Sequence, residues 1–223
     1  MNTICTEYEN SATTFAHLPD FSEFVRPRTF DELMLPERTI NLLQKVFDRK
    51  NPPNMLFYGS PGSGKSSCAS IFAKESSCLL HRFNCADQET KNYLKHELSS
   101  FVHAPSLFHR QKLFVFEEAD SLPPLTQLNL RDLIESSVHN ARFIFTCNNR
   151  SIIDAAIRSR LIEICFDASF DRRDELIHKL TETIMSRLSE LKLSVSRDDV
   201  FEIVRTHHPD YRKIVKLVEF RLL

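Results

Sequence analysis

One stretch of the chain, YGSPGSGKSS at residues 58–67, has the residue types that bind phosphate. It contains the spacing G-x-x-x-x-G-K-[S/T] from Gly59 to Ser66, and it holds all 3 glycines of the 223 residues. Glycine lets successive backbone N–H groups turn toward a phosphate with no Cβ in the way. Lys65 would neutralise the β- and γ-phosphates, and the Ser66 hydroxyl can ligate Mg²⁺. The alternative is an ordinary glycine-rich turn, but a preceding apolar strand and a following amphipathic helix favour a phosphate-binding loop.

Acidic residues follow a second apolar run. In KLFVFEEAD, Glu117 and Glu118 come directly after residues 112–116. A loop that hydrolyses nucleotide needs such an acidic strand end to hold the metal and to orient water. Ser66 and this acidic pair are therefore the candidates to hold a metal and to orient water, with a nucleoside triphosphate and Mg²⁺ as the expected ligands. The loop residues expected to contact the nucleotide are Gly59, Ser60, Pro61, Gly62, Ser63, Gly64, Lys65, Ser66 and Ser67.

The elements that must position these residues alternate between strand and helix. Short apolar runs rich in β-branched and aromatic residues predict strands covered on both faces. Amphipathic patterns between them predict helices, so the expected fold class is α/β with helices flanking the sheet. The predicted strands are 54–58, 79–84, 112–116, 141–146 and 161–166, and the predicted helices include one after residue 38 and those at 66–76, 89–101 and 125–136.

Beyond Phe166 the strand patterns stop and helical patterns continue. Two shorter helices, at 198–206 and 210–222, follow a longer one, and Asp210 is placed to cap the last of them. The predicted organisation is a leader at 1–22, an α/β nucleotide-binding domain at 23–168 and a small helical lid domain at 169–223. The apolar stripe of the longer helix consists of Leu176, Leu180, Ile184, Leu188 and Leu191.

The bulk composition limits the class of protein. Hydrophobic content of 42% and charged content of 26% are typical of a soluble globular protein. The formal net charge of −1 gives no global positive field, so any nucleic-acid site would be a local patch. The 6 cysteines lack metal-ligand spacing, which favours reduced thiols in a cytosolic or nuclear protein. The sequence has neither a signal-peptide pattern nor a run of about 18 apolar residues, so no membrane span is predicted.

Five ordered motifs resemble those of the AAA+ ATPases, and specifically the small ATPase subunits of sliding-clamp loaders of the replication factor C and phage types. FVRPRTFDELMLPER resembles their adenine-pocket segment, RFNCAD their L-N-A-S-D segment, and EEADSLPPLTQLNLRDLIE their D-E-A-D helix motif. FIFTCNNRSIIDAAIRSRL resembles the sensor-1 segment that leads to S-R-C, and HPDYRKIVKLVE resembles the sensor-2 helix. The resemblance covers most of residues 22–220. It implies a P-loop AAA+ fold: a five-stranded parallel sheet flanked by helices, followed by a helical lid.

The resemblance also implies ATP and Mg²⁺ as cofactors and roles for residues outside the loop, with Glu117 as the magnesium ligand and Glu118 as the general base. Asn148 matches sensor 1, Arg160 matches an arginine finger that acts in trans on a neighbour's ATP, and Arg212 matches the sensor-2 arginine. Lys91 and Lys95, four apart on one helical face, are candidate DNA contacts. Each has a plain alternative, either a solvated charge or, for Asn148, an amide that satisfies backbone groups. The residues expected to flank the adenine are Val25, Arg26, Pro27, Leu35 and Pro36, and those expected to couple DNA and neighbouring subunits to the site are Gln127 and Arg131.

The resemblance implies that this chain is an ATPase subunit of a clamp loader, which uses ATP binding and hydrolysis to load a DNA sliding clamp at primer–template junctions during DNA replication. The expected partners are other clamp-loader subunits in a ring, the sliding clamp and primer–template DNA, and no membrane. The expected location is the cytoplasm or the nucleus, and the replication machinery of a virus is included in this expectation. Two alternatives stay open. One is another DNA-associated AAA+ ATPase, such as a helicase loader or motor, and the other is a nucleotide-binding structural subunit with little hydrolysis.

Several positions depart from the family pattern. Glu117 stands where the family has Asp, and its carboxylate reaches one methylene further, while Mg²⁺ requires near-ideal geometry at about 2.0–2.1 Å. Leu161 replaces the cysteine of S-R-C, and Asp132 reverses the charge of the second arginine of an R-R pair. The resemblance ends near Leu223, where the family usually continues into a helical collar, so we expect weak or concentration-dependent assembly.

Overall fold

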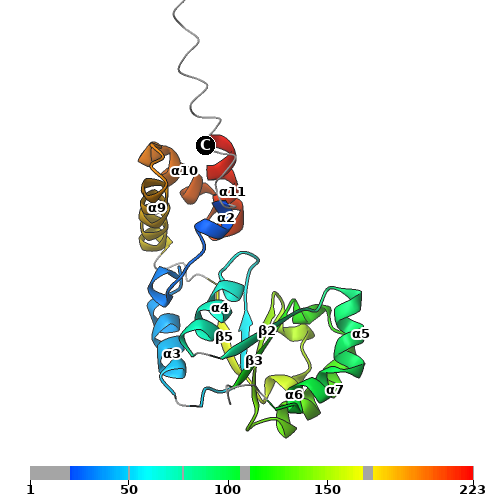
Figure 1. Cartoon of the computed structure of the whole chain (residues 1–223). Coiled ribbons are helices and arrows are strands. Elements are labelled where there is room, and N and C mark those ends of the chain that lie inside the picture. The colour runs from blue at the N-terminus through cyan, green and yellow to red at the C-terminus, as the bar shows by residue number, and fades with distance from the viewer. Residues whose placement is uncertain (1–20, 50, 77, 106–110, 168–172, 223) are drawn as a thin grey trace, which may run out of the picture.

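A parallel five-stranded sheet lies at the centre of the larger part of the molecule (Figure 1). The computed structural model describes residues 21–49, 51–76, 78–105, 111–167 and 173–222. The strand order is β2-β3-β4-β1-β5, which confirms the predicted parallel sheet. The strands are β1 (Met55–Tyr58), β2 (Leu79–Asn84), β3 (Lys112–Glu117), β4 (Ala141–Cys147) and β5 (Ile162–Cys165).

Burial differs between the central and the edge strands. Strands β1, β3 and β4 are almost wholly buried, as their continuous apolar runs predict. Strands β2 and β5 form the two edges and are only partly buried, so the prediction that every strand is covered on both faces is wrong for them. The edge position of β2 leaves polar side chains such as Arg82 and Asn84 exposed next to the end of β3.

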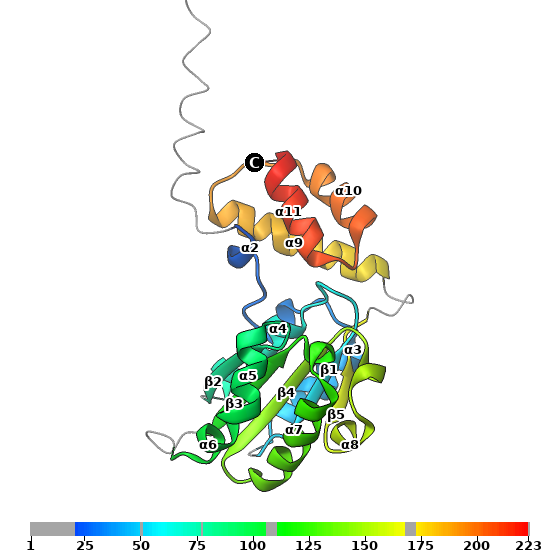
Figure 2. The ribbon, with the colours of Figure 1, turned by 90° about the vertical axis from the view of Figure 1, so that its right-hand side faces the viewer.

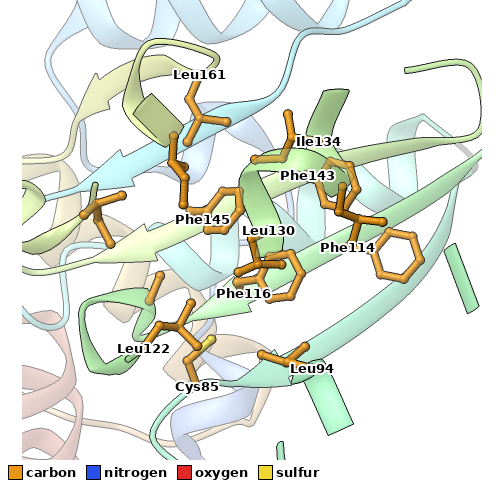
Figure 3. Packing of buried hydrophobic residues seen from close by; sticks show 14 of the residues in the cluster. Cys85, Leu94, Phe114, Phe116, Leu122, Leu130, Ile134, Phe143, Phe145 and Leu161 are labelled. Atoms are coloured by element: carbon orange, nitrogen blue, oxygen red, sulfur yellow. The ribbon is translucent and has the colours of Figure 1, made fainter. Parts of the chain in front are cut away.

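The two faces of the sheet carry different apolar side chains. Phe114, Phe116, Phe143 and Phe145 pack on one face, where the Phe116 and Phe145 ring centroids are 4.9 Å apart (Figure 3). Helices α5 (Gln88–His96), α6 (Leu98–His103) and α7 (Pro124–Ser136) contribute to this cluster. Residues that alternate with these phenylalanines pack on the opposite face with α3 (Glu37–Phe47) and α4 (Lys65–Glu75). These four phenylalanines therefore form core, as their place in predicted strands suggests.

The helices around the sheet follow the predicted pattern with one break. The single helix predicted at 89–101 is instead two that meet at Glu97, whose φ of −116° is far from the usual helical value of about −63° although the residue stays in the right-handed helical region. Helices α2 (Phe21–Phe24) and α8 (Ala155–Arg158) and the short 3-10 turns have no counterpart in the prediction. The helices of this part are α3 (Glu37–Phe47), α4 (Lys65–Glu75), α5 (Gln88–His96), α6 (Leu98–His103), α7 (Pro124–Ser136) and α8 (Ala155–Arg158), and the turns are η1 (Phe30–Glu32), η3 (Ala119–Ser121) and η4 (Arg150–Ile152).

Three helices form the lid above the sheet: α9 (Arg173–Glu190), α10 (Arg197–His207) and α11 (Tyr211–Leu222) (Figure 2). Their buried stripe includes Leu176 and Ile184, as predicted. The backbone N–H of Lys213 donates to Asp210 Oδ1 at 3.0 Å, which confirms the predicted cap of α11.

The segment before α3 belongs to both parts of the molecule. Helix α2 (Phe21–Phe24) begins inside the predicted leader, whose residues 1–20 lie outside the described ranges. Its Phe21, together with Val25, packs in the apolar cluster of the lid. The guanidinium of Arg187 in α9 pairs with both carboxylate oxygens of Glu32 at 2.9 Å. The segment thus ties the lid to the sheet domain.

Candidate nucleotide-binding site

The predicted phosphate-binding loop connects β1 to α4 at the carboxyl edge of the sheet. All three glycines have positive φ, the region that disfavours residues with a Cβ. Gly64, with φ 94°, is the N-cap of α4, so the first turn of that helix begins at Lys65. A helix N-terminus offers unpaired N–H groups and a partial positive charge. The loop therefore has the backbone geometry that a phosphate-binding site requires.

Lys65 lies at the centre of the loop. Its Nζ donates to the carbonyl oxygens of Gly59 at 2.7 Å and Ser60 at 2.8 Å, and lies 3.3 Å from Oδ1 of Asn148. Burial lowers the pKa of Lys65, and the nearby carboxylate of Asp167 partly opposes this effect. The loop carbonyls thus hold a positive charge at the position where phosphate would bind.

Glu118 has an unusual backbone conformation. It follows the last residue of β3 and adopts φ 55° and ψ 43°, in the left-handed region that a residue with a Cβ seldom enters. Such a conformation costs on the order of 1 kcal/mol and often occurs at functional sites. The side chain is exposed, so its carboxylate is accessible to water and substrate, as the predicted role of general base requires.

Glu117 is ion-paired with Arg82, a residue that the sequence analysis missed. Nη1 of Arg82 lies 2.6 Å from Glu117 Oε1, and Nη2 lies 3.4 Å from the backbone oxygen of Ser66. Nη2 also contacts the hydroxyl of Ser70. The only sequence signal for this pairing is the alternation along β2: Arg82 shares a face with Asn84, which is in register with Glu117.

Of the two predicted magnesium ligands, Glu117 thus has its carboxylate paired with a guanidinium, whereas Ser66 meets that guanidinium only through its backbone oxygen. Mg²⁺ usually binds proteins through one or two carboxylates together with phosphate oxygens and water. Among the described residues, no group of three or more His, Cys, Asp or Glu side chains could hold a metal ion on its own. As they stand, these side chains do not fit Mg²⁺, because the carboxylate carries another cation. The assignment of Mg²⁺ to Ser66 and Glu117 stays a prediction.

Asp120 fixes the loop that carries Asn148, and it too had no predicted role. Its Oδ2 accepts from the backbone N–H groups of Asn148 at 3.0 Å and Asn149 at 3.2 Å. This contact joins the end of β4 to the turn after β3 and leaves the Asn148 amide free to reach Lys65. Asp120, the fourth residue of EEAD, is therefore linked through Asn148 to Lys65 of the loop.

The lid contacts the loop at Gly62. A Cβ added at Gly62 would lie 2.9 Å from Asp210 Oδ1 and 3.4 Å from the backbone nitrogen of Arg212. The N-terminus of α11 thus lies directly against the loop, and Arg212 is exposed there. On the other side, the backbone N–H and hydroxyl of Ser60 both donate to Asp167 Oδ1 at 2.7 Å, a contact that the sequence analysis missed.

The predicted adenine-flanking residues lie in the segment between lid and sheet. Val25 is buried in the lid cluster, and Leu35 is buried in the cluster that contains α3 and α4. Arg26 is exposed and pairs with Glu23 at 2.9 Å. Pro27 is half-buried, and Pro36 is the buried N-cap of α3. Their contact with adenine stays a prediction.

Arg160 lies near the amino ends of the strands, whereas the phosphate-binding loop lies at their carboxyl ends. It precedes β5, in which Cys165 is in register with Tyr58 at the start of the loop. Five residues of extended chain span about 15 Å, more than an arginine side chain can cover. The guanidinium instead contacts Glu135 of α7, with Nε 2.6 Å from Oε1. An action of Arg160 on phosphate therefore requires a second chain, as the predicted role in trans does.

The remaining predicted residues divide into one internal contact and three surface charges. Gln127 is buried and joins α7 to α8, since its Oε1 accepts from the Asp154 backbone N–H at 2.7 Å. Arg131 pairs with its exposed neighbour Asp132 at 3.2 Å. Lys91 donates to the Ala86 carbonyl at 3.3 Å, and Lys95 is exposed on the same helix, α5. Their contacts with DNA stay predictions.

Two further findings concern the cysteines and the length of the apolar helices. The five described cysteines, Cys68, Cys78, Cys85, Cys147 and Cys165, are free thiols. Burial raises the pKa of the Cys85 thiol to about 12, which keeps it in the unreactive protonated form. In the described part of the chain, no helix combines the length and the apolar character needed to span a membrane.

Comparisons with known proteins bear on the family. The chain is 28% identical over 216 residues to replication factor C subunit 5 of Homo sapiens, covering 94% of this chain and 62% of the relative. It is 26% identical to replication factor C subunit 3 of Saccharomyces cerevisiae, covering 88% and 58%, and 33% identical to replication factor C small subunit 2 of Pyrobaculum islandicum, covering 65% and 47%. The chain thus spans between 47% and 62% of the length of these relatives.

The fold also resembles solved structures. The RuvB Holliday junction branch migration motor of Thermotoga maritima superposes with a TM-score of 0.69 at 18% identity, covering 88% of this chain and 64% of that one. A point mutant of the same motor superposes with a TM-score of 0.72 at 17% identity, covering 88% and 65%. Residues 55–168, about half of the chain, match the ATPase family associated with various cellular activities (AAA). This chain belongs to the AAA ATPase family.

Proposed function

We propose that this chain is an ATPase subunit of a clamp loader, which uses ATP binding and hydrolysis to load a sliding clamp at primer–template junctions. The observation that carries the proposal is the contact of the α11 N-terminus with the phosphate-binding loop at Gly62. A phosphate held by the loop would lie beside both the sheet domain and the lid. Nucleotide binding is thereby coupled to the position of the lid, which is what an ATP-driven loader requires.

The residues of the site suggest a division of work. Lys65 and the N-terminus of α4 bind the phosphates, because both present positive charge at the loop. Glu118 accepts a proton from the attacking water, and Asn148 orients that water or the γ-phosphate. Arg160 of a neighbouring subunit neutralises charge in the transition state, an effect worth about 10³–10⁵ in rate for arginine fingers.

The relatives support the partners in this proposal. Their names are those of replication factor C subunits, which is why we propose other clamp-loader subunits, the clamp and primer–template DNA as partners. The proposed compartment is the nucleus or the cytoplasm, where replication takes place. Contacts with DNA phosphates would come from Lys91 and Lys95 on α5, and they would weaken with salt.

A second candidate is a structural subunit that binds nucleotide and hydrolyses little of it. The ion pair between Arg82 and Glu117 favours this candidate, because it occupies the acid that would otherwise serve the metal. The third possibility, another DNA-associated AAA+ motor or helicase loader, has only the likeness in fold to the RuvB motor, which at 18% identity does not indicate function.

One experiment separates these functions. Phosphate release from ATP is measured for the complex of the full chain with its partner subunits. The three conditions are the complex without DNA, the complex with primer–template DNA, and the complex with DNA and a sliding clamp. A clamp loader shows the highest rate with both present, whereas another DNA motor responds to DNA alone. A structural subunit binds ATP and shows no release above that of its Lys65→Ala variant. A rate that DNA and clamp leave unchanged would contradict the clamp-loader proposal.

A further inference from the structure

We propose that Arg82 serves as the built-in counter-cation of Glu117, so that this chain binds ATP with little dependence on Mg²⁺. The inference rests on the proposed nucleotide site and says how that site treats its metal. It follows from where the guanidinium lies: it contacts the carboxylate of Glu117 and the backbone oxygen of Ser66, the two residues expected to hold Mg²⁺. One of them, Ser66, belongs to the first turn of α4, and the other, Glu117, ends β3.

The contacts of Arg82 hold it in this place from two directions. Nη1 forms a charge-assisted bond of 2.6 Å with Glu117 Oε1. Nη2 reaches α4, where it lies 3.4 Å from the Ser66 carbonyl oxygen and contacts the Ser70 hydroxyl. A guanidinium is a rigid planar fork, so two fixed partners on different elements define its orientation. Both side chains of the ion pair are about one-third exposed or less.

The same bridge sets the charge of the site. Glu117 and Arg82 together carry no net charge, whereas a free carboxylate in this place would repel the phosphates of ATP until a metal neutralised it. Lys65 and the N-terminus of α4 remain to attract the phosphates. Binding of ATP therefore meets no unpaired carboxylate at Glu117 in the absence of Mg²⁺. A metal ion that uses Glu117 must first displace the guanidinium.

The position of β2 makes this arrangement possible. β2 is the edge strand next to β3, and Asn84 is in register with Glu117. Side chains alternate between the two faces of a strand, so Arg82, two residues before Asn84 in β2, projects on the same face as Asn84. From there the side chain spans the gap to the start of α4. A shorter or neutral side chain at position 82 could not reach both anchors.

The test is equilibrium binding of a fluorescent ATP analogue to the full chain, once with Mg²⁺ and once with EDTA. For each variant the measured quantity is the ratio of the dissociation constant in EDTA to that in Mg²⁺. We expect a ratio below about threefold for the wild type and above about tenfold for Arg82→Ala, since the freed carboxylate then needs the metal. The matched control is Arg197→Ala, which removes an exposed arginine that pairs with Glu182 at 2.7 Å in the lid. Its ratio should equal that of the wild type.

A second variant keeps the test decisive if Arg82→Ala does not fold. In the double variant Arg82→Gln/Glu117→Gln neither charge remains, and we expect its ratio to return to the wild-type value. A wild-type ratio above about tenfold, or an Arg82→Ala ratio within about threefold of the wild type, would overturn the inference. If the wild type binds the analogue in neither condition, the nucleotide site itself is refuted, and the inference fails with it. If binding depends strongly on Mg²⁺ in both the wild type and Arg82→Ala, the inference about Arg82 is refuted and the nucleotide site stands.

Discussion

The Nζ of Lys65 lies 3.3 Å from the side-chain oxygen of Asn148, although 83 residues separate the two in the chain. The strand order explains the contact, because β1 and β4 are neighbours and both end at the same edge of the sheet. The loop after β1 and the asparagine after β4 therefore meet. A γ-phosphate bound beside Lys65 would lie within reach of the Asn148 amide, which supports the proposed role of that residue.

The first prediction compares two glycines of the loop. Gly62 and Gly64 both have positive φ, so an alanine at either should lower the free energy of unfolding by about 1 kcal/mol. Only at Gly62 would the new Cβ meet the lid, 2.9 Å from Asp210 Oδ1. At Gly64 the nearest atom is a Leu33 side-chain carbon at 3.6 Å. Gly62→Ala should therefore displace α11 from the loop, and Gly64→Ala should not.

Hydrogen exchange at the amides of residues 211–214, read by mass spectrometry, checks this comparison. We expect faster exchange in Gly62→Ala than in Gly64→Ala at equal loss of stability by urea unfolding. Equal exchange in the two variants would show that the lid does not depend on its contact with the loop.

Glu118→Gln should separate hydrolysis from binding. The amide keeps the volume of the side chain but cannot accept a proton from water, and general bases contribute about 10²–10⁴ in rate. Phosphate release should fall by at least about a hundredfold, whereas the affinity for ATP stays within a few-fold of the wild type. Unchanged release would remove the general-base role of Glu118. Asp120→Asn is a comparison variant that should disturb the Asn148 loop instead.

Arg160 should act only between chains. The Arg160 side chain lies near the amino ends of the strands, away from its own loop, and pairs with Glu135. Arg160→Ala should therefore leave ATP binding by the single chain unchanged. In the assembled complex both Arg160→Ala and Lys65→Ala should be inactive. Mixing the two variants should restore part of the phosphate release, since an intact loop then meets an intact arginine from its neighbour. No recovery in the mixture, at a concentration where the wild type assembles, would contradict an action in trans.

His208 should make the fold sensitive to mild acid. It is buried with 7% of its surface exposed, and its Nε2 has no hydrogen-bond partner among the described residues. Burial, with a smaller effect from the charge of Arg173, lowers the pKa of His208 below its usual 6.5. Below pH 6.5 the unfolded chain therefore binds this proton more readily than the folded one. The free energy of unfolding should fall as pH drops from 6.5 to the lowered pKa, by at most about 1.4 kcal/mol per pH unit from this residue.

Urea unfolding at pH 7.5 and 5.5 measures this effect. His81, whose pKa burial and Lys112 also lower, contributes in the same direction, so the comparison is with His208→Phe. The variant should lose less stability than the wild type between the two pH values, and exposed His103→Asn should behave as the wild type does. An equal loss in wild type and His208→Phe would contradict the prediction.

Local patterns were enough to predict most of the fold. Apolar runs marked all five strands, and the run at 79–84 matches β2 at both ends. The break at Glu97 was missed, because no proline or glycine marks it and Leu94 and Leu98 on either side are both buried. The exposed edge of β2 was missed for a related reason: strand order is set by contacts between segments distant in the sequence, and periodicity within a strand does not contain it.

The site followed the same division. The loop and its strand-to-helix context were predicted from consecutive residues, and the strained backbone at Glu118 lies where the acidic motif was expected. The contacts of Arg82 with Glu117 and of Asp167 with Ser60 were missed. Each joins residues that meet only because β2 lies beside β3 or β5 beside β1, so neither has a signature at a fixed spacing.

The proposed function requires that the loop of this chain binds ATP through Lys65. Isothermal titration calorimetry of ATP into the wild type and into Lys65→Ala measures this requirement. We expect a single site in the wild type and binding weaker by at least about a hundredfold in the variant, a loss of about 2.7 kcal/mol. Binding of equal strength in both proteins, or none in the wild type, would contradict it.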